Sequence, residues 1–312
     1  MKTLALLFAA AAVFAADLRL GLVGTDTSHV TAFTKILNDP AAPDHVPGAR
    51  VVAAYKGGSP DLDESRNRID KFTKELQDKW QVKIVASIEE LCSQVDAVVL
   101  TSVDGRVHLT QARPIIAAHK PLFIDKPLAS TLEDAREIAR LAKAAGVPWF
   151  SSSSLRFGGI AAMRSLDLAG AMTWGPGPLE QHHQLELAWY AIHPIEGLYT
   201  LMGPGCEEVT RIYTPEADVI VGRWKGGRIG TVRALRPYSE YGVVVYRKNQ
   251  KNQTAEAVTK LHDGYGPLLR EIVQFFQTGK PPVSNEETLE IFAFLDAAQR
   301  SKESGGKPMA LR

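Results

Sequence analysis

The sequence predicts an α/β protein with an N-terminal Rossmann-like, doubly wound parallel sheet and a C-terminal α+β domain with a largely antiparallel open sheet. Three observations lead to this fold class. Strand-like runs alternate with helical patterns in the first half, strand-like runs dominate much of the second half, and 312 residues are too many for one ordinary core. We expect the first domain to cover residues 17–150 and the second to cover residues 151–312.

The composition is that of an ordinary folded protein. Apolar residues make up 45% of the chain and charged residues 23%, so neither disorder nor a membrane bundle is indicated. The 36 basic residues nearly balance the 35 acidic ones, giving a net charge of +1 without a long run of one sign. A nucleic-acid partner is therefore not expected. Cys92 and Cys206 are too few for a disulfide framework, and we interpret both as buried small hydrophobes.

The first 15 residues have the pattern of a secretory signal peptide. Lys2 supplies the positive charge, an apolar run covers residues 4–14, and Val13-Phe14-Ala15 precedes the expected cleavage site. The alternatives are a buried first strand or a short membrane anchor, but the apolar run is below the roughly 20 residues needed to span a bilayer. We therefore expect export to the periplasm or the extracellular space, with no membrane span.

The first half reads as repeated strand and helix units. Ser87 and Glu90 form a capping box at the start of one helix, and Ser130 and Glu133 predict a second, which Gly146 closes. Crossovers of this length specify a parallel sheet with right-handed connections. The expected strands are residues 18–23, 51–55, 82–85, 97–100, 122–124 and 147–150.

Ligands bind such a sheet at the carboxyl ends of its strands. The segments that follow the expected strands should therefore meet in one crevice. These segments are residues 24–28, 56–59, 102–108 and 125–127.

The second half changes to helical stretches followed by strand-like runs. Lys225-Gly226-Gly227 is a hairpin signal between two of these runs, and two amphipathic helices, near residues 268–276 and 286–299, close the chain. An antiparallel sheet with helices on one face leaves its other face to be covered, so we expect homo-oligomers. The expected strands are residues 209–213, 219–224, 228–235 and 242–246.

The turn after the first strand departs from the G-x-G-x-x-G phosphate-binding pattern. Gly24 is kept, but Asp26 and His29 stand where the second and third glycines belong. A carboxylate at residue 26 would repel a pyrophosphate unless it points away or caps the helix. One interpretation is simple helix capping. The other is that phosphate oxygens still bind the helix amides and the hydroxyls of Thr25, Thr27 and Ser28.

Lys56 ends the second strand, where an enzyme selective for NAD usually carries an acidic residue. A lysine beside two glycines and Ser59 would suit a 2′-phosphate, which favours NADP over NAD. The alternative is a solvated lysine on a surface loop.

The segment after the fifth strand carries the most specific motif. Asp125-Lys126-Pro127, together with His108, resembles the Glu-Lys-Pro and Asn-x-x-His signatures of the Gfo/Idh/MocA (glucose-fructose oxidoreductase, inositol dehydrogenase, MocA) family. Leu155-Arg156-Phe157 and residues 281–284 resemble later segments of that family. The resemblance implies an oxidoreductase that transfers a hydride between a sugar or cyclitol hydroxyl and NADP or NAD, which it could keep tightly bound.

The resemblance also implies the roles of individual residues. Lys126 would hydrogen-bond the substrate hydroxyl beside the nicotinamide, and a cis peptide bond would precede Pro127. The expected cofactor contacts are Gly24, Thr25, Thr27, Ser28, Lys56, Ser59, Ser102, His108, Asp125 and Lys126.

The segment 189–196 resembles the family's catalytic helix, in which an Asp precedes a His by four residues. His193 matches the histidine, and Trp189 replaces the aspartate. A spacing of four would place both side chains on one helix face, where an acid could orient the imidazole as a base. Because Trp cannot do so, Tyr190 or Glu196 would supply the polar partner, or the proton path differs.

We expect the catalytic residues to be Lys126, His193 and Tyr190. No standard metal spacing is present, so no metal is expected. Two other functions stay open: a glycosidase of the same family that uses a retained dinucleotide, and a cofactor-free sugar-binding protein, which the altered phosphate loop favours. The expected substrate contacts are Arg156, His182, His183 and Glu196.

Overall fold

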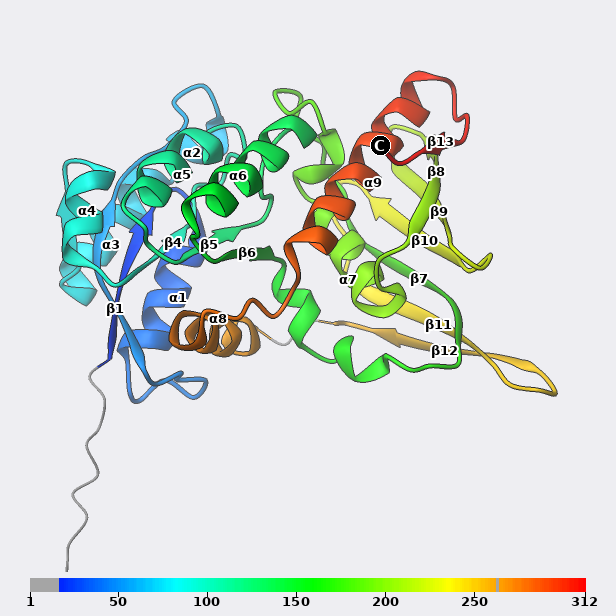
Figure 1. The fold of residues 1–312 in the computed structure, drawn as a ribbon, viewed down its shortest axis with the longest axis horizontal. Coiled ribbons are helices and arrows are strands. Elements are labelled where there is room, and N and C mark those ends of the chain that lie inside the picture. The colour runs from blue at the N-terminus through cyan, green and yellow to red at the C-terminus, as the bar shows by residue number, and fades with distance from the viewer. Residues whose placement is uncertain (1–16, 262–263) are drawn as a thin grey trace, which may run out of the picture.

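The computed structural model describes residues 17–261 and 264–312, so the expected signal peptide at residues 1–15 lies outside the described residues. Two sheets lie side by side (Figure 1). The first has six parallel strands in the order β3-β2-β1-β4-β5-β6, which is the doubly wound Rossmann order. The second has seven strands in the order β12-β11-β7-β10-β9-β8-β13. The predicted fold class is confirmed.

The first sheet and its helices follow the predicted alternation. Its strands are β1 (Leu18–Val23), β2 (Ala49–Tyr55), β3 (Lys83–Val85), β4 (Ala97–Leu100), β5 (Leu122–Asp125) and β6 (Trp149–Ser152). Its helices are α1 (Ser28–Asn38), α2 (Asp63–Arg66), α3 (Ile69–Trp80), α4 (Ile88–Gln94), α5 (His108–Ala117) and α6 (Leu132–Ala145).

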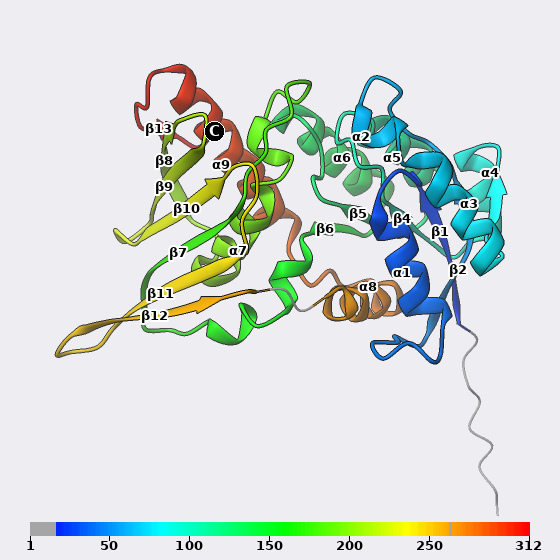
Figure 2. The same ribbon diagram turned by 180° about the vertical axis from the view of Figure 1, so that it is seen from behind.

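Helices cover both faces of this sheet because its strands are apolar on both sides. One layer contains α1, α3 and α8 (Gly266–Thr278), whose apolar side chains share a core with β1 and β2. The other contains α4, α5 and α6 and belongs to a core that continues into the second domain. Helix α8 comes after the second sheet in sequence yet lies beside α1 (Figure 2). The chain therefore returns to the first sheet before it ends.

The helix caps agree with the sequence prediction at one helix and differ at another. Ser87 caps α4 by accepting from the Glu90 N–H at 3.0 Å, so the predicted cap is confirmed. The Glu90 carboxylate accepts in return from the Ala86 N–H at 3.0 Å, one residue before the position that a capping box requires. The prediction of Ser130 and Glu133 for α6 is wrong by one residue, because Thr131 accepts from the Asp134 N–H at 3.0 Å. Ser130 instead uses its carbonyl to accept from the Leu185 N–H.

The second sheet is mixed, with β7 and β10 parallel and its other pairs antiparallel. The predicted hairpin is confirmed, since Gly226 and Gly227 have positive φ angles of 81° and 82° between β9 and β10. Strands β7 and β12 were not predicted. The remaining elements are β7 (Leu168–Pro176), α7 (Ile192–Met202), β8 (Cys206–Tyr213), β9 (Ala217–Trp224), β10 (Ile229–Leu235), β11 (Gly242–Lys248), β12 (Gln253–Thr259), α9 (Asn285–Glu303) and β13 (Met309–Ala310), with short 3₁₀ turns at Ser154–Phe157, Ala161–Met163 and Glu186–Ala188.

Helices α7 and α9 pack on one face of the second sheet. Both cysteines are free and buried, and burial raises the pKa of the Cys92 thiol to about 11 and that of Cys206 to about 12. This agrees with their interpretation as small hydrophobic residues. Within the described part of the chain, no helix is both long and apolar enough to cross a bilayer.

Candidate active site

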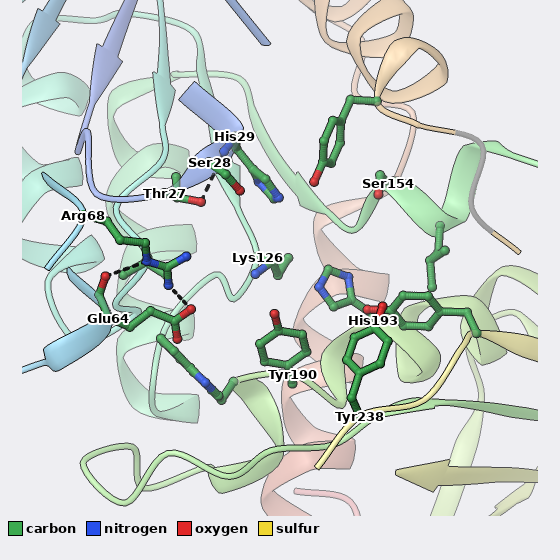
Figure 3. Close-up of a pocket in the computed structure, with 15 residues that line it drawn as sticks. Thr27, Ser28, His29, Glu64, Arg68, Lys126, Ser154, Tyr190, His193 and Tyr238 are labelled. Carbon is green, nitrogen blue, oxygen red and sulfur yellow. Dashed lines mark hydrogen bonds and ion pairs between the residues drawn. The ribbon is translucent and has the colours of Figure 1, made fainter. Parts of the chain in front are cut away.

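A cavity of about 180 Å³ lies where the carboxyl edge of the first sheet meets the second domain. Figure 3 shows side chains from both domains directed into it. Three of the residues expected to be catalytic, Lys126, Tyr190 and His193, are brought together there. The lining residues are Thr27, Ser28, His29, Glu64, Arg68, Val103, Lys126, Ser154, Leu155, Trp189, Tyr190, His193, Tyr238, Tyr241 and Tyr265.

A glycine is required at residue 24 because the chain after β1 passes very close to the chain after β4. The φ angle of Gly24 is +88°, and a Cβ atom there would lie 2.1 Å from the Ser102 Oγ and 2.4 Å from the Ser102 nitrogen. The missing side chain therefore makes room for the loop after β4. Gly24 does not line the cavity.

Asp26 points away from the cavity, into the protein. Its buried carboxylate accepts from the Ser65 Oγ at 2.6 Å and from the Val103 N–H at 3.0 Å. Burial raises the pKa of Asp26, and the two hydrogen bonds only partly offset that effect. The carboxylate at the second glycine position thus links the phosphate loop to α2 and to the loop after β4.

The three hydroxyl residues of this loop have different surroundings. Thr25 is fully buried, and its Oγ1 lies 2.6 Å from the Thr73 Oγ1, so it does not face the cavity. Thr27 caps α1 by accepting from the His29 N–H at 3.4 Å, and Thr27 and Ser28 both line the cavity. The first backbone N–H groups of this 11-residue helix, which have no acceptor within the helix, lie at the same end of α1.

The first residues after β2, including Lys56 and Ser59, do not line the cavity. Lys56 is half-exposed, and its Nζ is 2.7 Å from the Asp70 carboxylate. Ser59 is buried, and its N–H donates to the Ser65 Oγ at 2.8 Å. Farther along, Glu64 and Arg68 form an ion pair that borders the cavity. Arg68 was not among the expected contacts.

Ser102 and His108 hold the loops beneath the cavity. The Ser102 Oγ donates to the Gln111 Oε1 at 2.7 Å. The His108 ring is fully buried, with Nε2 2.7 Å from the Ser102 carbonyl oxygen and Nδ1 3.2 Å from the Leu128 carbonyl oxygen. Burial lowers the pKa of His108. This ring ties the loop after β4 to the loop after β5, which carries Lys126.

His29, Asp125 and Lys126 form a charged group at one wall of the cavity. The His29 Nδ1 and the Asp125 Oδ2 are 2.5 Å apart, and the Lys126 N–H donates to Asp125 Oδ1 at 2.9 Å. Burial raises the pKa of Asp125, but the neighbouring His29 and Lys126 outweigh it, and the pKa lies below its ordinary value. The peptide bond between Lys126 and Pro127 is cis.

The expectation that Trp189 and His193 share one helix face is wrong. Helix α7 begins at Ile192, and Trp189 ends the preceding 3₁₀ turn. The Trp189 ring packs edge-on against His183 at 5.4 Å. The Nδ1 of His193 instead lies 2.7 Å from the hydroxyl of Ser153, which follows β6. Neither Tyr190 nor Glu196 takes this position.

Aromatic rings surround His193 and Lys126. The Tyr190 and Tyr241 rings lie 6.0 Å and 5.7 Å from the His193 ring. The Lys126 Nζ is 5.8 Å from the centre of the Tyr190 ring. Burial lowers the pKa of Lys126, the charge of Asp125 opposes this, and Arg68 lowers it further. A partly desolvated ammonium therefore faces the imidazole.

The four expected substrate contacts lie outside the cavity lining. Arg156 forms a buried ion pair with Glu196 and a second one with Glu287. His182 turns to Glu180, with its Nδ1 2.5 Å from the carboxylate. The buried His183 turns to Asp104, with its Nε2 3.0 Å from Oδ1. Arg156, Glu196 and His183 are thus held by charged partners inside the protein, whereas His182 pairs with Glu180 at its surface.

Asp104 connects the two domains. It accepts from Arg106, which also pairs with Asp61 in the loop before α2. Burial alone would raise the pKa of Asp104, but the hydrogen bonds from His183 and Arg106 hold it well below its usual range. This network joins the second domain to the segment that carries Glu64 and Arg68.

Comparison with known proteins identifies the first domain. Residues 25–152 match the family model described as "Oxidoreductase family, NAD-binding Rossmann fold" under the name GFO_IDH_MocA. The matched residues lie within the Rossmann-like domain and make up less than half of the chain. This match confirms the resemblance of the first domain, with its Asp125-Lys126-Pro127 segment, to that family.

Two curated relatives match parts of this domain. A 1,5-anhydro-D-fructose reductase of Ensifer adhaerens is 41% identical over 75 residues, which is 24% of this chain and 22% of the relative. An inositol 2-dehydrogenase of Cereibacter sphaeroides is 32% identical over 132 residues, which is 41% of this chain and 34% of the relative. The matches thus span about a third of these relatives or less.

Solved structures match over nearly the whole chain and support the fold. A myo-inositol dehydrogenase from Lactobacillus casei in complex with NAD(H) and myo-inositol has a TM-score of 0.70 at 17% identity, covering 95% of this chain and 97% of its own. An oxidoreductase from Agrobacterium radiobacter in complex with NAD+, L-tartaric acid and magnesium has a TM-score of 0.71 at 13% identity, covering 95% of this chain and 99% of its own. Both domains of the fold therefore have counterparts.

Sequence reasoning missed residues that line the cavity, among them His29 and Arg68, and it missed Ser153, which contacts His193. His29 was treated only as a missing glycine, although its place in the first turn of α1 directs it toward the end of β5. Arg68 could have been found from the helical pattern that begins at Ile69, because it directly precedes that helix. Ser153 carried no recognisable signal, since its partner is 40 residues away.

Proposed function

We propose that this protein is an exported dehydrogenase that transfers a hydride between a sugar or cyclitol hydroxyl and NADP or NAD. The observation that carries the proposal is the meeting of Lys126, Tyr190 and His193 in one cavity at the carboxyl edge of a Rossmann sheet. The names of the relatives, an inositol dehydrogenase and an anhydrofructose reductase, support this substrate class.

The donors around the cavity fit the anionic part of a dinucleotide. Thr27, Ser28 and the amides at the beginning of α1 offer neutral donors, while Arg68 and Lys126 offer cations. Asp26 does not oppose this because its carboxylate is buried against Ser65 and Val103. When bound, the nicotinamide would accept or supply the hydride.

The side chains of this chain would position the substrate and move its proton. The Lys126 ammonium would donate a hydrogen bond to the reacting hydroxyl oxygen and favour its deprotonation. The His193 imidazole would take the hydroxyl proton during oxidation and return it during reduction. The Tyr190 ring, which lies beside both, would limit the access of water to the pair.

Lys56 bears on the choice between NADP and NAD. Its half-exposed ammonium pairs with Asp70 on the surface, so a 2′-phosphate would have to compete with that carboxylate. We propose NADP as the preferred cofactor, because an exposed pair of this kind contributes little stability and a phosphate can replace the carboxylate beside Lys56. Titration of the wild type and Lys56→Ala with NADP+ and NAD+ tests this, because only the NADP+ affinity should fall in the variant.

The mechanism is tested by two substitutions and one matched control. His193→Ala should lower kcat about 100- to 10,000-fold and leave dinucleotide affinity nearly unchanged, since the imidazole moves a proton. Lys126→Ala should lower both kcat and dinucleotide affinity. His182→Ala is the control, because its ring lies outside the cavity and contacts Glu180. Turnover is measured on myo-inositol, 1,5-anhydro-D-fructose and a panel of aldoses.

The outcome that contradicts the mechanism is near-normal turnover in His193→Ala. A native mass spectrum of the purified protein separates the proposal from its rivals. A retained dinucleotide supports the dehydrogenase, whereas its absence together with failure to bind added NADP+ or NAD+ indicates a cofactor-free sugar-binding protein. A family-related glycosidase would retain the dinucleotide but cleave a glycosidic bond without net change in it.

A further inference from the structure

A serine that lies next to the lysine of the site contacts the His193 ring. Strands β5 and β6 are parallel neighbours, and Asp125 pairs in register with Ser152. The residues that follow them, Lys126 and Ser153, therefore leave the sheet side by side. Because the Ser153 Oγ is 2.7 Å from the His193 Nδ1, the imidazole is fixed beside the ammonium.

The position of Ser153 is itself well determined. Its side chain is fully buried, and its Oγ accepts from the Leu155 N–H at 3.2 Å as the cap of the following 3₁₀ turn. The Ser153 hydroxyl can accept from the His193 Nδ1–H or donate to Nδ1, according to the tautomer of the ring. With the proton on Nδ1, the Nε2 of that ring keeps its lone pair and can accept a proton.

We propose that Ser153 is the positioning residue that holds His193 in the tautomer and orientation of a general base. The inference rests on the proposed function, in which His193 moves the substrate proton. It explains how the site works with Trp189 at the position of the acid, since Trp189 has turned to His183.

A neutral partner has a specific consequence for the dependence of the rate on pH. A carboxylate beside an imidazole favours its protonated form, whereas a hydroxyl only fixes its orientation. His193 with a serine partner should therefore stay neutral, and able to accept a proton, to a lower pH than it would with a carboxylate partner. The acid limb of the pH-rate profile should accordingly be displaced upward when a carboxylate is introduced.

Other charged and titratable groups near His193 also influence its protonation. Lys126 extends from β5, Tyr190 precedes α7, and Tyr241 precedes β11, and the latter two rings lie within about 6 Å of it. On α7 itself, Glu196 is already paired with Arg156. The remaining titratable residues that line the cavity are His29, Glu64, Arg68, Tyr238 and Tyr265.

The first experiment observes the imidazole directly and needs no substrate. Protein with ¹⁵N-labelled histidine is studied by NMR across pH, and His193→Gln assigns the resonance. We expect the Nδ1–H tautomer in the wild type and a mixture of tautomers in Ser153→Ala. Ser152→Ala is the matched control, because this neighbouring buried hydroxyl donates to the Ser153 carbonyl oxygen at 3.0 Å and does not contact the ring.

The second experiment uses the pH dependence of kcat and KM on the panel member that turns over fastest. Ser153→Ala should lower kcat about 10- to 100-fold with a smaller change in KM, the size common for losing a residue that orients a reacting group. Ser153→Thr should restore most of the rate. Ser153→Asp should move the acid limb upward by about one to two pH units.

The two readouts separate this inference from the proposed function. An unchanged tautomer and an unchanged pH profile in Ser153→Ala would overturn the role of Ser153. If the tautomer changes in Ser153→Ala while His193→Ala retains its turnover, the pairing of Ser153 with His193 stands. The proposed function then fails.

Discussion

Restoring the expected glycine at Asp26 should weaken the protein without improving its affinity for a dinucleotide. Asp26→Gly removes the carboxylate that accepts hydrogen bonds from the Ser65 Oγ at 2.6 Å and from the Val103 N–H at 3.0 Å. Leaving each of these two donors without a partner costs about 1–3 kcal/mol, and the added backbone freedom of glycine costs about 0.5–1 kcal/mol.

Two features reduce that sum. Val103 is only partly buried, so water can reach its amide. Burial also raises the pKa of Asp26, which means that the ionised carboxylate carries a desolvation cost that its removal relieves. We therefore expect the free energy of unfolding to fall by about 2–4 kcal/mol.

The assay is urea denaturation followed by circular dichroism, with dinucleotide affinity measured by calorimetry. Asp26→Asn is the control, because it keeps an oxygen for the Val103 N–H and should cost less. A glycine variant that is as stable as the wild type and binds NADP+ or NAD+ more tightly would refute the reasoning. That result would mean that the Asp26 carboxylate of the wild type faces the phosphates of the dinucleotide.

Three further predictions concern the domain contact, the assembly and the N-terminus. Asp104→Asn should destabilise the protein by about 3–5 kcal/mol at pH 7, because it breaks a buried ionic network. The pKa of Asp104 is lowered in the folded state, so this stabilisation is present above about pH 4 and is lost as the pH falls below it. Urea titrations at about pH 7 and about pH 3 should show the difference between wild type and variant shrinking at the lower pH. We expect a homo-oligomer that covers the open face of the second sheet, where Ile212, Ile229 and Tyr246 are exposed, and a monomer in light scattering at micromolar concentration would contradict it. We also expect the mature chain to begin near Ala16, and Edman sequencing that finds Met1 on the protein would remove the export proposal.

The regular part of the fold could be predicted from local sequence patterns. Apolar runs such as residues 97–100 are buried on both faces only in a covered parallel sheet, and glycines at positions 146, 226 and 227 have the positive φ angles that end helices and turn hairpins. Strand β12 was missed because most of its residues are exposed and polar, and β7 because glycines interrupt its apolar pattern. The cap of α6 is shifted by one residue, from Ser130 to Thr131, and the Ser130 carbonyl oxygen accepts from the Leu185 N–H of the second domain.

The candidate site was only partly accessible to sequence reasoning. The sequence by itself determined that Lys126 follows a buried strand and that a histidine lies early in a helix of the second half, since both depend on neighbouring residues. The tertiary structure alone decided that Asp26 faces inward, that Arg156 and Glu196 pair with each other, and that Ser153 reaches His193. Side-chain direction at the ends of strands depends on which loops pack together, and residues 40 positions apart or more leave no periodic pattern that would reveal such a pair.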